Sequence, residues 1–197
     1  MRVLSTETPD HMLPLTPSQT VGPFFAILVS TTGRVTLATD RTEGQRIVVD
    51  GSVCDGAGQP VSDALVEIWQ ANASGHCNHP DDSRTRGPDS TFDGFGRVPT
   101  DGDGRFTVDT IKPGIVPGPE GTPQAPHLLV GIFARGLLTR LVTRIYFEDE
   151  PGNAQDPILA CVAPDRRATL IASRHAEGHY RFAVVLHGPH ETVFFDV

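Results

Sequence analysis

Cysteine is scarce in this sequence, and long apolar runs are missing. The three cysteines, Cys54, Cys77 and Cys161, are too few and of odd number, so they do not form the framework of a disulfide-stabilised scaffold. No run approaches the roughly 18 apolar residues that a membrane-spanning helix needs. The first segment, MRVLSTETPDHMLPL, lacks the apolar stretch of a signal peptide. We therefore expect a soluble, cytoplasmic protein without a membrane partner.

Basic charge is also in short supply. The chain has 16 Lys and Arg against 24 Asp and Glu, a net charge of −8 at pH 7, and Lys112 is its only lysine. A protein that binds a phosphate backbone needs a basic surface. The charge balance therefore argues against a nucleic-acid partner.

Glycine and proline, by contrast, are abundant. The 197 residues include 20 Gly and 17 Pro, which disfavours a helical bundle and favours short elements joined by turns. Alternating apolar and β-branched residues predict strands at seven places: 46–53, 64–70, 105–109, 127–133, 138–147, 180–186 and 192–196. The expected fold class is all-β, an antiparallel β-sandwich with long loops, an irregular N-terminal arm and little helix.

The pattern divides the chain into two segments. We expect residues 1–45 to form an N-terminal arm and lead-in that contacts a partner, and residues 46–197 to form the sandwich. Residues 71–103 are expected to be a long loop, and residues 113–126 hold too many prolines for a regular ladder. A short helix is expected within 165–172, after Pro164.

The arm contains TPSQTVGPFF, residues 16–25, in which Pro17, Gly22 and Pro23 disfavour regular structure. It nevertheless ends in the aromatic pair Phe24 and Phe25. Such a pair needs a place to bury its rings. Two places remain open, the core of this chain and the surface of a neighbouring chain.

Several familiar catalytic and metal-binding patterns are incomplete. The DGDGR segment, residues 101–105, would need a Glu at the twelfth loop position to bind calcium, but that position holds Lys112, so a turn is expected. His76, Cys77 and His79 have no second ligand cluster at the spacing of a zinc site. The G-x-S-x-G, G-x-G-x-x-G and Walker patterns are absent.

One strand carries half of a metal-binding pattern. Two His separated by one residue on a strand point to the same face and can share a metal ion. His127 stands in the first such position, but the second is Leu129, which cannot ligate. A single His on a strand is more often a structural residue than a ligand.

Longer motifs carry a family resemblance. They are GxVxDxxGxPVxxAxVEIWQANAxG at 51–75, FxGFGRxxTDxxGxFxxxTIKPG at 92–114, ARGLLxRLxTRIYF at 134–147, TLIASR at 169–174 and YRFxVxLxGxxETVFFD at 180–196. From Thr16 onward the sequence resembles the intradiol ring-cleaving dioxygenases. Within that family it is most similar to the α subunit of the two-subunit members that act on protocatechuate. The TPSQTVGPFF arm and the ETVFFD terminus are the main reasons.

This resemblance implies an enzyme that cleaves an aromatic ring between two hydroxyl-bearing carbons, using O2 and a non-haem Fe(III) held by two Tyr and two His. Phenolate oxygens favour ferric iron, which acts as a Lewis acid. By motif alignment, the four ligand positions fall on Cys77, Val116, His127 and Leu129, and a catalytic Arg position falls on Gln124.

A single imidazole cannot hold Fe(III), so the resemblance implies that this chain binds no catalytic iron. The iron is then expected on a β-subunit partner, with which the chain assembles into a higher αβ oligomer. The region around His76 and the degenerate positions is expected to be a vestigial site filled by side chains.

The resemblance also implies a role for the arm. Thr20, Gly22 and Pro23 are expected to line the substrate pocket of the partner, where Gly22 permits close approach to a flat ring and Pro23 fixes the direction of the arm. Alternatively, the Gly-Pro pair is only a turn. Arg135 is a weaker candidate that could complement a substrate carboxylate, or could form only an interface or surface ion pair.

Two other readings of the sequence remain. One is a self-sufficient single-chain dioxygenase that acts on catechol or hydroxyquinol, against which the missing ligands count heavily. The other is a non-enzymatic β-sandwich module that binds a small molecule or a protein, which the motif at 51–66 alone would also fit.

Overall fold

The structure is a computed structural model that describes residues 16–22, 25, 32–80, 82, 91–118 and 121–196. Within these residues, nine strands form one sheet in the order β1-β5-β2-β11-β10-β9-β8-β3-β4. The strands are β1 (Arg34–Thr36), β2 (Arg46–Cys54), β3 (Leu65–Trp69), β4 (Phe95–Pro99), β5 (Arg105–Ile111), β8 (His127–Phe133), β9 (Leu141–Phe147), β10 (Ile171–Ala176) and β11 (His179–Val185).

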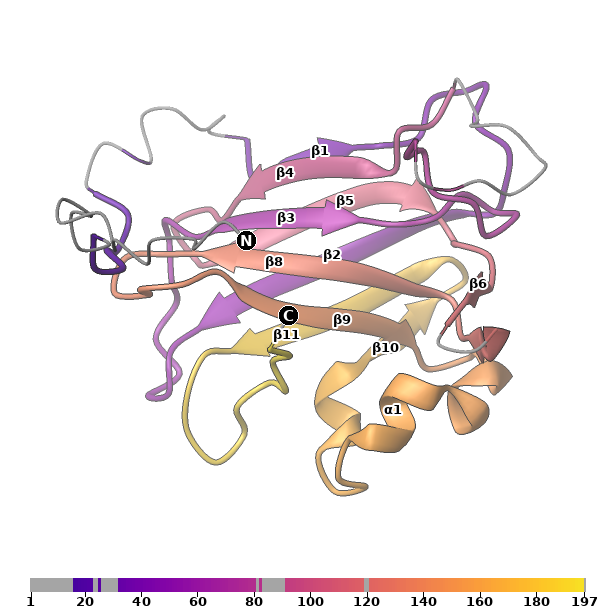
Figure 1. The fold of residues 1–197 in the computed structure, drawn as a ribbon. Helices are drawn as coiled ribbons and strands as arrows, with labels where there is room; N and C mark the ends of the chain where they lie inside the picture. The colour runs from indigo at the N-terminus through magenta and orange to yellow at the C-terminus, as the bar shows by residue number, and fades with distance from the viewer. Residues whose placement is uncertain are drawn as a thin grey trace, which may run out of the picture.

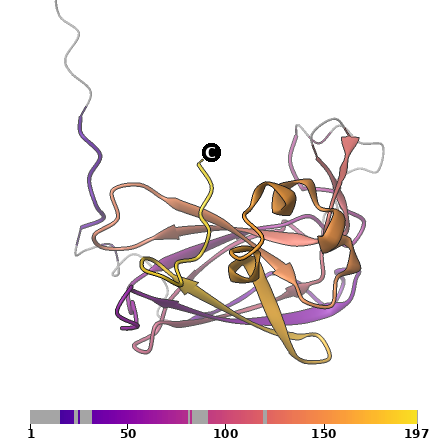
Figure 2. The ribbon, with the colours of Figure 1, turned by 90° about the horizontal axis from the view of Figure 1, so that it is seen from below.

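The sheet curls until its two edges meet, so it encloses the core as two layers (Figures 1 and 2). One layer contains β5, β2 and β11, and the other contains β9, β8 and β3. A ladder of two residue pairs, Ile171 with Tyr146 and Ala172 with Phe147, connects β10 to β9. At the edges, Leu37 beyond β1 packs against Gly96 of β4. The expected all-β class, with little helix among the described residues, is confirmed.

Alternation along the strands produces the core. In β2, Val49 and Val53 are buried while Asp50 between them is exposed, as the two-residue period requires. In β3, Val66 and Ile68 face the core and Glu67 faces outward, as the same period requires. Gly51 also faces inward, and a Cβ there would overlap the Phe106 ring on the neighbouring strand. These contacts fix which face of each strand is available to solvent.

The pairing is more mixed than the antiparallel arrangement expected. Most neighbouring strands are antiparallel, but in the described sheet β1 with β5, β2 with β11 and β9 with β10 are parallel. Strand β1 lies inside the segment expected to be lead-in and extends the sheet through β5. The division at residue 45 stays a prediction.

Two loop predictions were wrong. The segment expected to be a loop over 71–103 contains β4, an antiparallel partner of β3. Its sequence, FGRVP, is short and contains glycine and proline, and Pro99 is tolerated because it ends the strand at a sheet edge. The proline-rich stretch 113–126 also forms a small ladder, in which β6 (Val116–Pro117) pairs with β7 (Pro123–Gln124).

The C-terminal predictions need correction as well. The described residues contain one α-helix, α1 (Pro157–Cys161), which the sequence analysis missed. The helix expected within 165–172 is only a 3-10 turn, η4 (Arg167–Leu170), and is followed by β10. The strand expected at 192–196 is reduced to an isolated bridge between Phe195 and Val142 of β9. The structure of these short elements is determined by tertiary contacts more than by the local sequence pattern.

The DGDGR turn is confirmed. The Asp101 carboxylate accepts hydrogen bonds from the backbone N–H of Asp103 and of Arg105, both at 2.9 Å, and Gly104 adopts φ +71°. The Asp101 carboxylate is therefore occupied by hydrogen bonds within its own turn.

Among the described residues, no helix has the length and apolar character needed to cross a membrane.

Candidate functional site

Strand β8 presents the incomplete metal-binding pattern, His127 and Leu129, on the face that it shares with β9. His127 and Leu129 lie two residues apart on β8 and therefore share a face. Their register partners on β9 are Tyr146 and Arg144, respectively. Side chains directly opposite each other on paired strands are close neighbours. The face therefore brings His127 beside a phenol and Leu129 beside a guanidinium group.

Two loops pack tightly at the end of the sheet where β8 begins. A Cβ at Gly75, which adopts φ +81°, would collide with the carbonyl oxygen of Ile115. The backbone N–H of Gly114 donates a 2.9 Å hydrogen bond to the carbonyl oxygen of Asn72. These contacts join the loop that carries Cys77 to the segment that carries Val116. Cys77 itself is half-buried, and its backbone N–H donates to the Asp82 carboxylate at 2.8 Å.

A polar cluster lies among the degenerate ligand positions. Arg144 Nη1 donates a hydrogen bond of 2.6 Å to Gln124 Oε1 and one of 3.2 Å to the Tyr146 hydroxyl. Gln124 Nε2 donates in turn to the carbonyl oxygen of Pro117 at 3.1 Å. The guanidinium group of Arg144 also lies 6.0 Å from the ring centre of Phe195. Gln124, which the family resemblance aligns with a catalytic Arg, therefore accepts a hydrogen bond from Arg144 of β9.

Asp156 anchors this cluster to helix α1. It is 1% exposed and accepts from the Tyr146 hydroxyl at 3.1 Å and from the backbone N–H of Ala125 at 2.8 Å. The same carboxylate caps α1 by accepting from the N–H groups of Ile158 and Leu159. Figure 1 shows α1 and β6 at the same end of the sheet, beside the start of β8. Asp156 thus connects the helix to the β7–β8 junction and to β9.

His127 is held as a neutral ring. Its Nδ1 lies 2.7 Å from the carbonyl oxygen of Ala125, and because a carbonyl can only accept, Nδ1 carries the proton. Burial, followed by the positive charge of Arg144, lowers the pKa of His127 to about 4. The Tyr146 ring lies 5.4 Å away, and burial raises the pKa of its hydroxyl. Both rings therefore remain uncharged near neutral pH.

The residues present do not fit the Fe(III) that the family resemblance implies. Among the described residues, no three His, Cys, Asp or Glu side chains form a group that could hold a metal ion. The four ligand positions supply one imidazole, one thiol and two hydrocarbon side chains. Ferric iron favours phenolate and imidazole ligands, and the nearby Tyr146 hydroxyl is committed to Asp156 and Arg144.

The arm approaches the opposite end of β8. The Thr20 hydroxyl accepts from the backbone N–H of Gly136 at 2.7 Å and donates to the carbonyl oxygen of Ala134 at 3.5 Å. These residues flank Arg135, whose side chain is 65% exposed and forms an ion pair with Asp63. The structure therefore brings two of the sequence-predicted residues, Thr20 and Arg135, to one turn.

The other arm residues are less engaged. Gly22 is exposed, and a Cβ built on it would meet no atom within 4 Å. Its carbonyl oxygen accepts from the N–H of Phe25, which is half-buried. Pro23 and Phe24 lie outside the described residues. The choice between burial of the aromatic pair in this chain and burial against a neighbour stays open.

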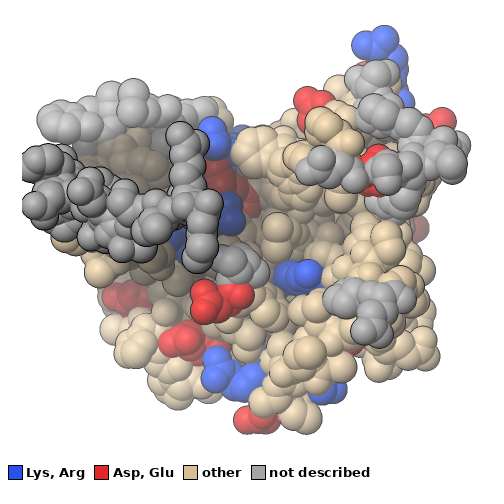
Figure 3. All heavy atoms as spheres, viewed as in Figure 1, with Lys and Arg blue, Asp and Glu red and all other residues tan. Residues whose placement is uncertain are grey.

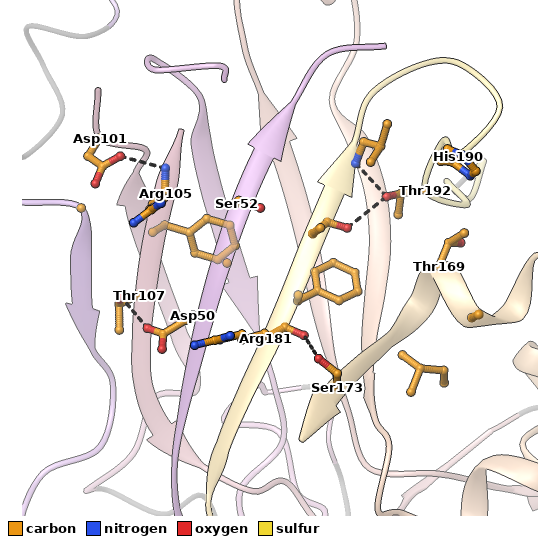
Figure 4. A pocket seen from close by; sticks show the side chains of 18 residues that line it. Asp50, Ser52, Asp101, Arg105, Thr107, Thr169, Ser173, Arg181, His190 and Thr192 are labelled. Atoms are coloured by element: carbon orange, nitrogen blue, oxygen red, sulfur yellow. Dashed lines mark hydrogen bonds between the residues drawn. The ribbon is translucent and has the colours of Figure 1, made fainter. Parts of the chain in front are cut away.

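A separate groove of about 950 Å³ lies on the other layer of the sheet. Figure 4 shows Asp50 and Ser52 from β2, Arg105 and Thr107 from β5, and Arg181 from β11 along it. The Asp50 carboxylate accepts from the Thr107 hydroxyl at 3.0 Å. The groove is a polar, solvent-facing sheet surface, and none of the described residues that line it lies on β8 or β9.

Charges of both signs are interspersed on the face that carries β3, β8 and β9 (Figure 3). Glu67 of β3, for example, lies between two arginines, at 2.7 Å from Arg97 and 3.7 Å from Arg140.

Sequence reasoning missed Arg144, Tyr146 and Asp156. The signal for Asp156 was present, since Asp followed by Pro is typical of a helix N-cap with Pro in the first turn. The signal for Arg144 was weaker. It stands opposite Leu129 only because of the β8–β9 register, which periodicity alone does not provide.

Comparison with known proteins agrees with this geometry. A family model described as Dioxygenase matches residues 21–188. The chain is 42% identical to the protocatechuate 3,4-dioxygenase alpha chain of Burkholderia cepacia, over 92% of this chain and 97% of that one. It is 40% identical to the alpha chain of Pseudomonas putida, over 95% and 99%.

A solved structure is also similar. It is the dioxygenase domain of a dioxygenase carbohydrate-binding protein fusion from Streptomyces sp. SirexAA-E, with 30% identity and a TM-score of 0.58 over 88% of this chain and 98% of that one. The strand order, the motifs and these matches agree. The chain therefore belongs to the intradiol dioxygenase family and is a homologue of protocatechuate 3,4-dioxygenase alpha chains.

Proposed function

We propose that this chain is the α subunit of a protocatechuate 3,4-dioxygenase and acts without a metal ion of its own. Its partner is a β-type chain that holds Fe(III), and the pair, further assembled into a higher αβ oligomer, uses O2 to convert protocatechuate to 3-carboxy-cis,cis-muconate. One observation carries the proposal. The chain matches alpha chains over more than nine tenths of its length, yet among the described residues its ligand positions do not form a donor set for iron.

The proposed contribution of this chain is to complete the partner's substrate pocket. The Thr20 hydroxyl attaches the arm to the backbone on both sides of Arg135. Gly22, two residues further along, presents backbone without a side chain and is exposed. A flat aromatic ring can approach such a backbone closely. The arm would therefore exclude water from one side of the bound substrate and restrict its orientation.

Arg135 would add a charge to the same pocket. Its guanidinium is a permanent cation, and it is mostly exposed while paired with Asp63. A carboxylate on the substrate can be bound by such a group through charge-assisted hydrogen bonds. In this proposal Asp63 holds the guanidinium until substrate carboxylate competes for it.

The test compares two preparations. The chain is purified alone and also after co-expression with a β-type partner, and each sample is assayed for iron content and for O2 uptake with protocatechuate. We expect iron and O2 uptake only in the co-purified complex. Stoichiometric iron with O2 uptake in the lone chain would instead support a self-sufficient enzyme. Absence of complex formation with the β-type partner would support a binding module.

A further inference from the structure

Arg144 places a permanent positive charge at the degenerate metal centre. It lies opposite Leu129 in the β8–β9 register, on the face that also carries His127. The guanidinium group does not point freely into solvent, because the same Nη1 is bound by Gln124 and by Tyr146. A guanidinium stays protonated at any pH at which the protein is folded. The centre therefore holds a fixed cation that belongs to the chain.

His127 has the orientation that a metal-binding imidazole would need. A ligating His characteristically donates its non-ligating N–H to a carbonyl or carboxylate, which fixes the ring and its tautomer. His127 Nδ1 lies 2.7 Å from the Ala125 carbonyl oxygen in this way, which leaves Nε2 with a lone pair. The loss of metal binding is therefore not explained by a disordered or misdirected imidazole. The remaining causes of the loss of metal binding are the missing ligand side chains at the other positions and the nearby positive charge of Arg144.

The Arg144 cluster also connects β6 and the start of β8, two of the segments that carry the degenerate ligand positions. Through Gln124 it reaches β7 and, from there, the carbonyl oxygen of Pro117 on β6. Through Tyr146 it reaches Asp156, which accepts from the N–H of Ala125 just before β8. The β6–β7 ladder, the start of β8, strand β9 and helix α1 are thus joined by hydrogen bonds around one cation.

We propose that the Arg144 guanidinium takes the place of the metal ion at this centre, both by joining these segments and by repelling metal cations from His127. The guanidinium attracts the amide oxygen of Gln124 and the phenol oxygen of Tyr146, as a bound metal ion attracts its oxygen ligands. A second cation brought next to it must overcome charge repulsion in a partly buried site, where screening by water is weak. Arg144 is thus a determinant of the metal-free state, in addition to the loss of ligands.

The experiment restores one ligand and varies the charge. In the full chain, Leu129→His creates the pair of imidazoles two residues apart on β8, a minimal site for Zn²⁺. Zinc affinity is measured by isothermal titration for Leu129→His alone and for Leu129→His combined with Arg144→Gln. We expect the combined variant to bind Zn²⁺ at least about tenfold more tightly, because the fixed charge is gone.

Two controls separate charge from structure. Leu129→His with Arg140→Gln removes a positive charge just before β9, where Arg140 faces Glu67 at 3.7 Å, and is expected to bind zinc like Leu129→His alone. Leu129→His with Arg144→Lys keeps the charge but loses the planar donor geometry. It is expected to melt at a lower temperature than Leu129→His and yet to exclude zinc equally well.

The outcomes distinguish the proposal from its alternatives. Equal zinc affinity of the Leu129→His chain with and without Arg144→Gln, including no binding in either variant, would overturn it, because Arg144 would then not be what keeps metal out. Release of zinc binding by Arg144→Lys would overturn the charge argument as well. If Arg144→Gln prevents folding, Arg144→Lys still tests the proposal, because tighter zinc binding in that variant, with the charge retained, would overturn it. The titration needs neither a partner subunit nor turnover, so it fails or succeeds independently of the proposed function.

Discussion

The two ends of strand β8 use their polar groups in opposite ways. At the end where β8 begins, Tyr146 and Asp156 are buried and bonded to several partners each. At the end where β8 finishes, Thr20 and Arg135 are exposed and attached through few contacts. Buried polar groups must be satisfied within the chain, whereas exposed groups can exchange partners at low cost. The first end is therefore built for stability and the second is available to a partner.

The largest effect should come from Asp156. Asp156→Ala removes the α1 cap, takes away the acceptor of the buried Tyr146 O–H and leaves the Ala125 N–H unsatisfied. We expect a loss of about 4 kcal/mol in unfolding free energy, or about 10 °C in melting temperature. Differential scanning calorimetry measures it. Asp165→Ala, at an exposed carboxylate, is the matched control. A similarly small shift in both variants would mean that the hydrogen bonds of Asp156 do not stabilise the end where β8 begins.

The next effect depends on pH. His127 has a pKa of about 4 in the folded chain and about 6.5 when unfolded. As the pH falls, His127 is protonated in the unfolded chain before it is protonated in the folded chain. The free energy of unfolding is therefore highest above pH 6.5 and decreases progressively down to pH 4. The loss attributable to His127 is about 3 kcal/mol. The free energy of unfolding in urea is measured for the wild type and for His127→Gln at about pH 7 and about pH 4.5, two values that enclose most of this pH range. An identical pH dependence in both would show that His127 is not held neutral.

Thr20 should have a small effect on stability and a larger one on turnover. Thr20→Ala loses the hydrogen bonds to Gly136 and Ala134 at the surface, at a cost of about 0.5 kcal/mol. In the complex with a β-type partner, we expect a reduced kcat/KM for protocatechuate, and Thr20→Ser should retain it. Full activity of Thr20→Ala, and of the chain that lacks residues 1–23, would remove the arm from the proposed pocket.

The smallest effect on stability should come from Arg135. Its exposed ion pair with Asp63 contributes less than about 1 kcal/mol. Arg135→Gln should therefore leave the melting temperature nearly unchanged while raising KM for protocatechuate in the complex. Catechol, which has no carboxylate, serves as the comparison substrate and should be affected less. Equal effects on both substrates would argue for an interface role instead.

The sequence predicted the fold class and the strands that carry strong alternation, such as those at 46–53 and 127–133. It missed β4 and β10, because these short strands are specified by their neighbours more than by their own residues. At the site, motif matching assigned the degenerate positions. It did not predict that Arg144 would reach Gln124, because that contact depends on register and on the position of the β6–β7 ladder.

The register between β8 and β9 has an evolutionary consequence. His127 and Leu129 lie on the less buried face of β8, so replacing them leaves intact the core contacts that set the register of this ladder. Single substitutions can therefore change the chemistry at the centre while every neighbour stays in place. After a gene is duplicated, one copy can lose its metal ligands, acquire an internal cation and still present an unchanged outline to its sister chain. An insertion or deletion of one residue within these strands would instead reverse the faces, so divergence of such a pair is expected to proceed by substitution.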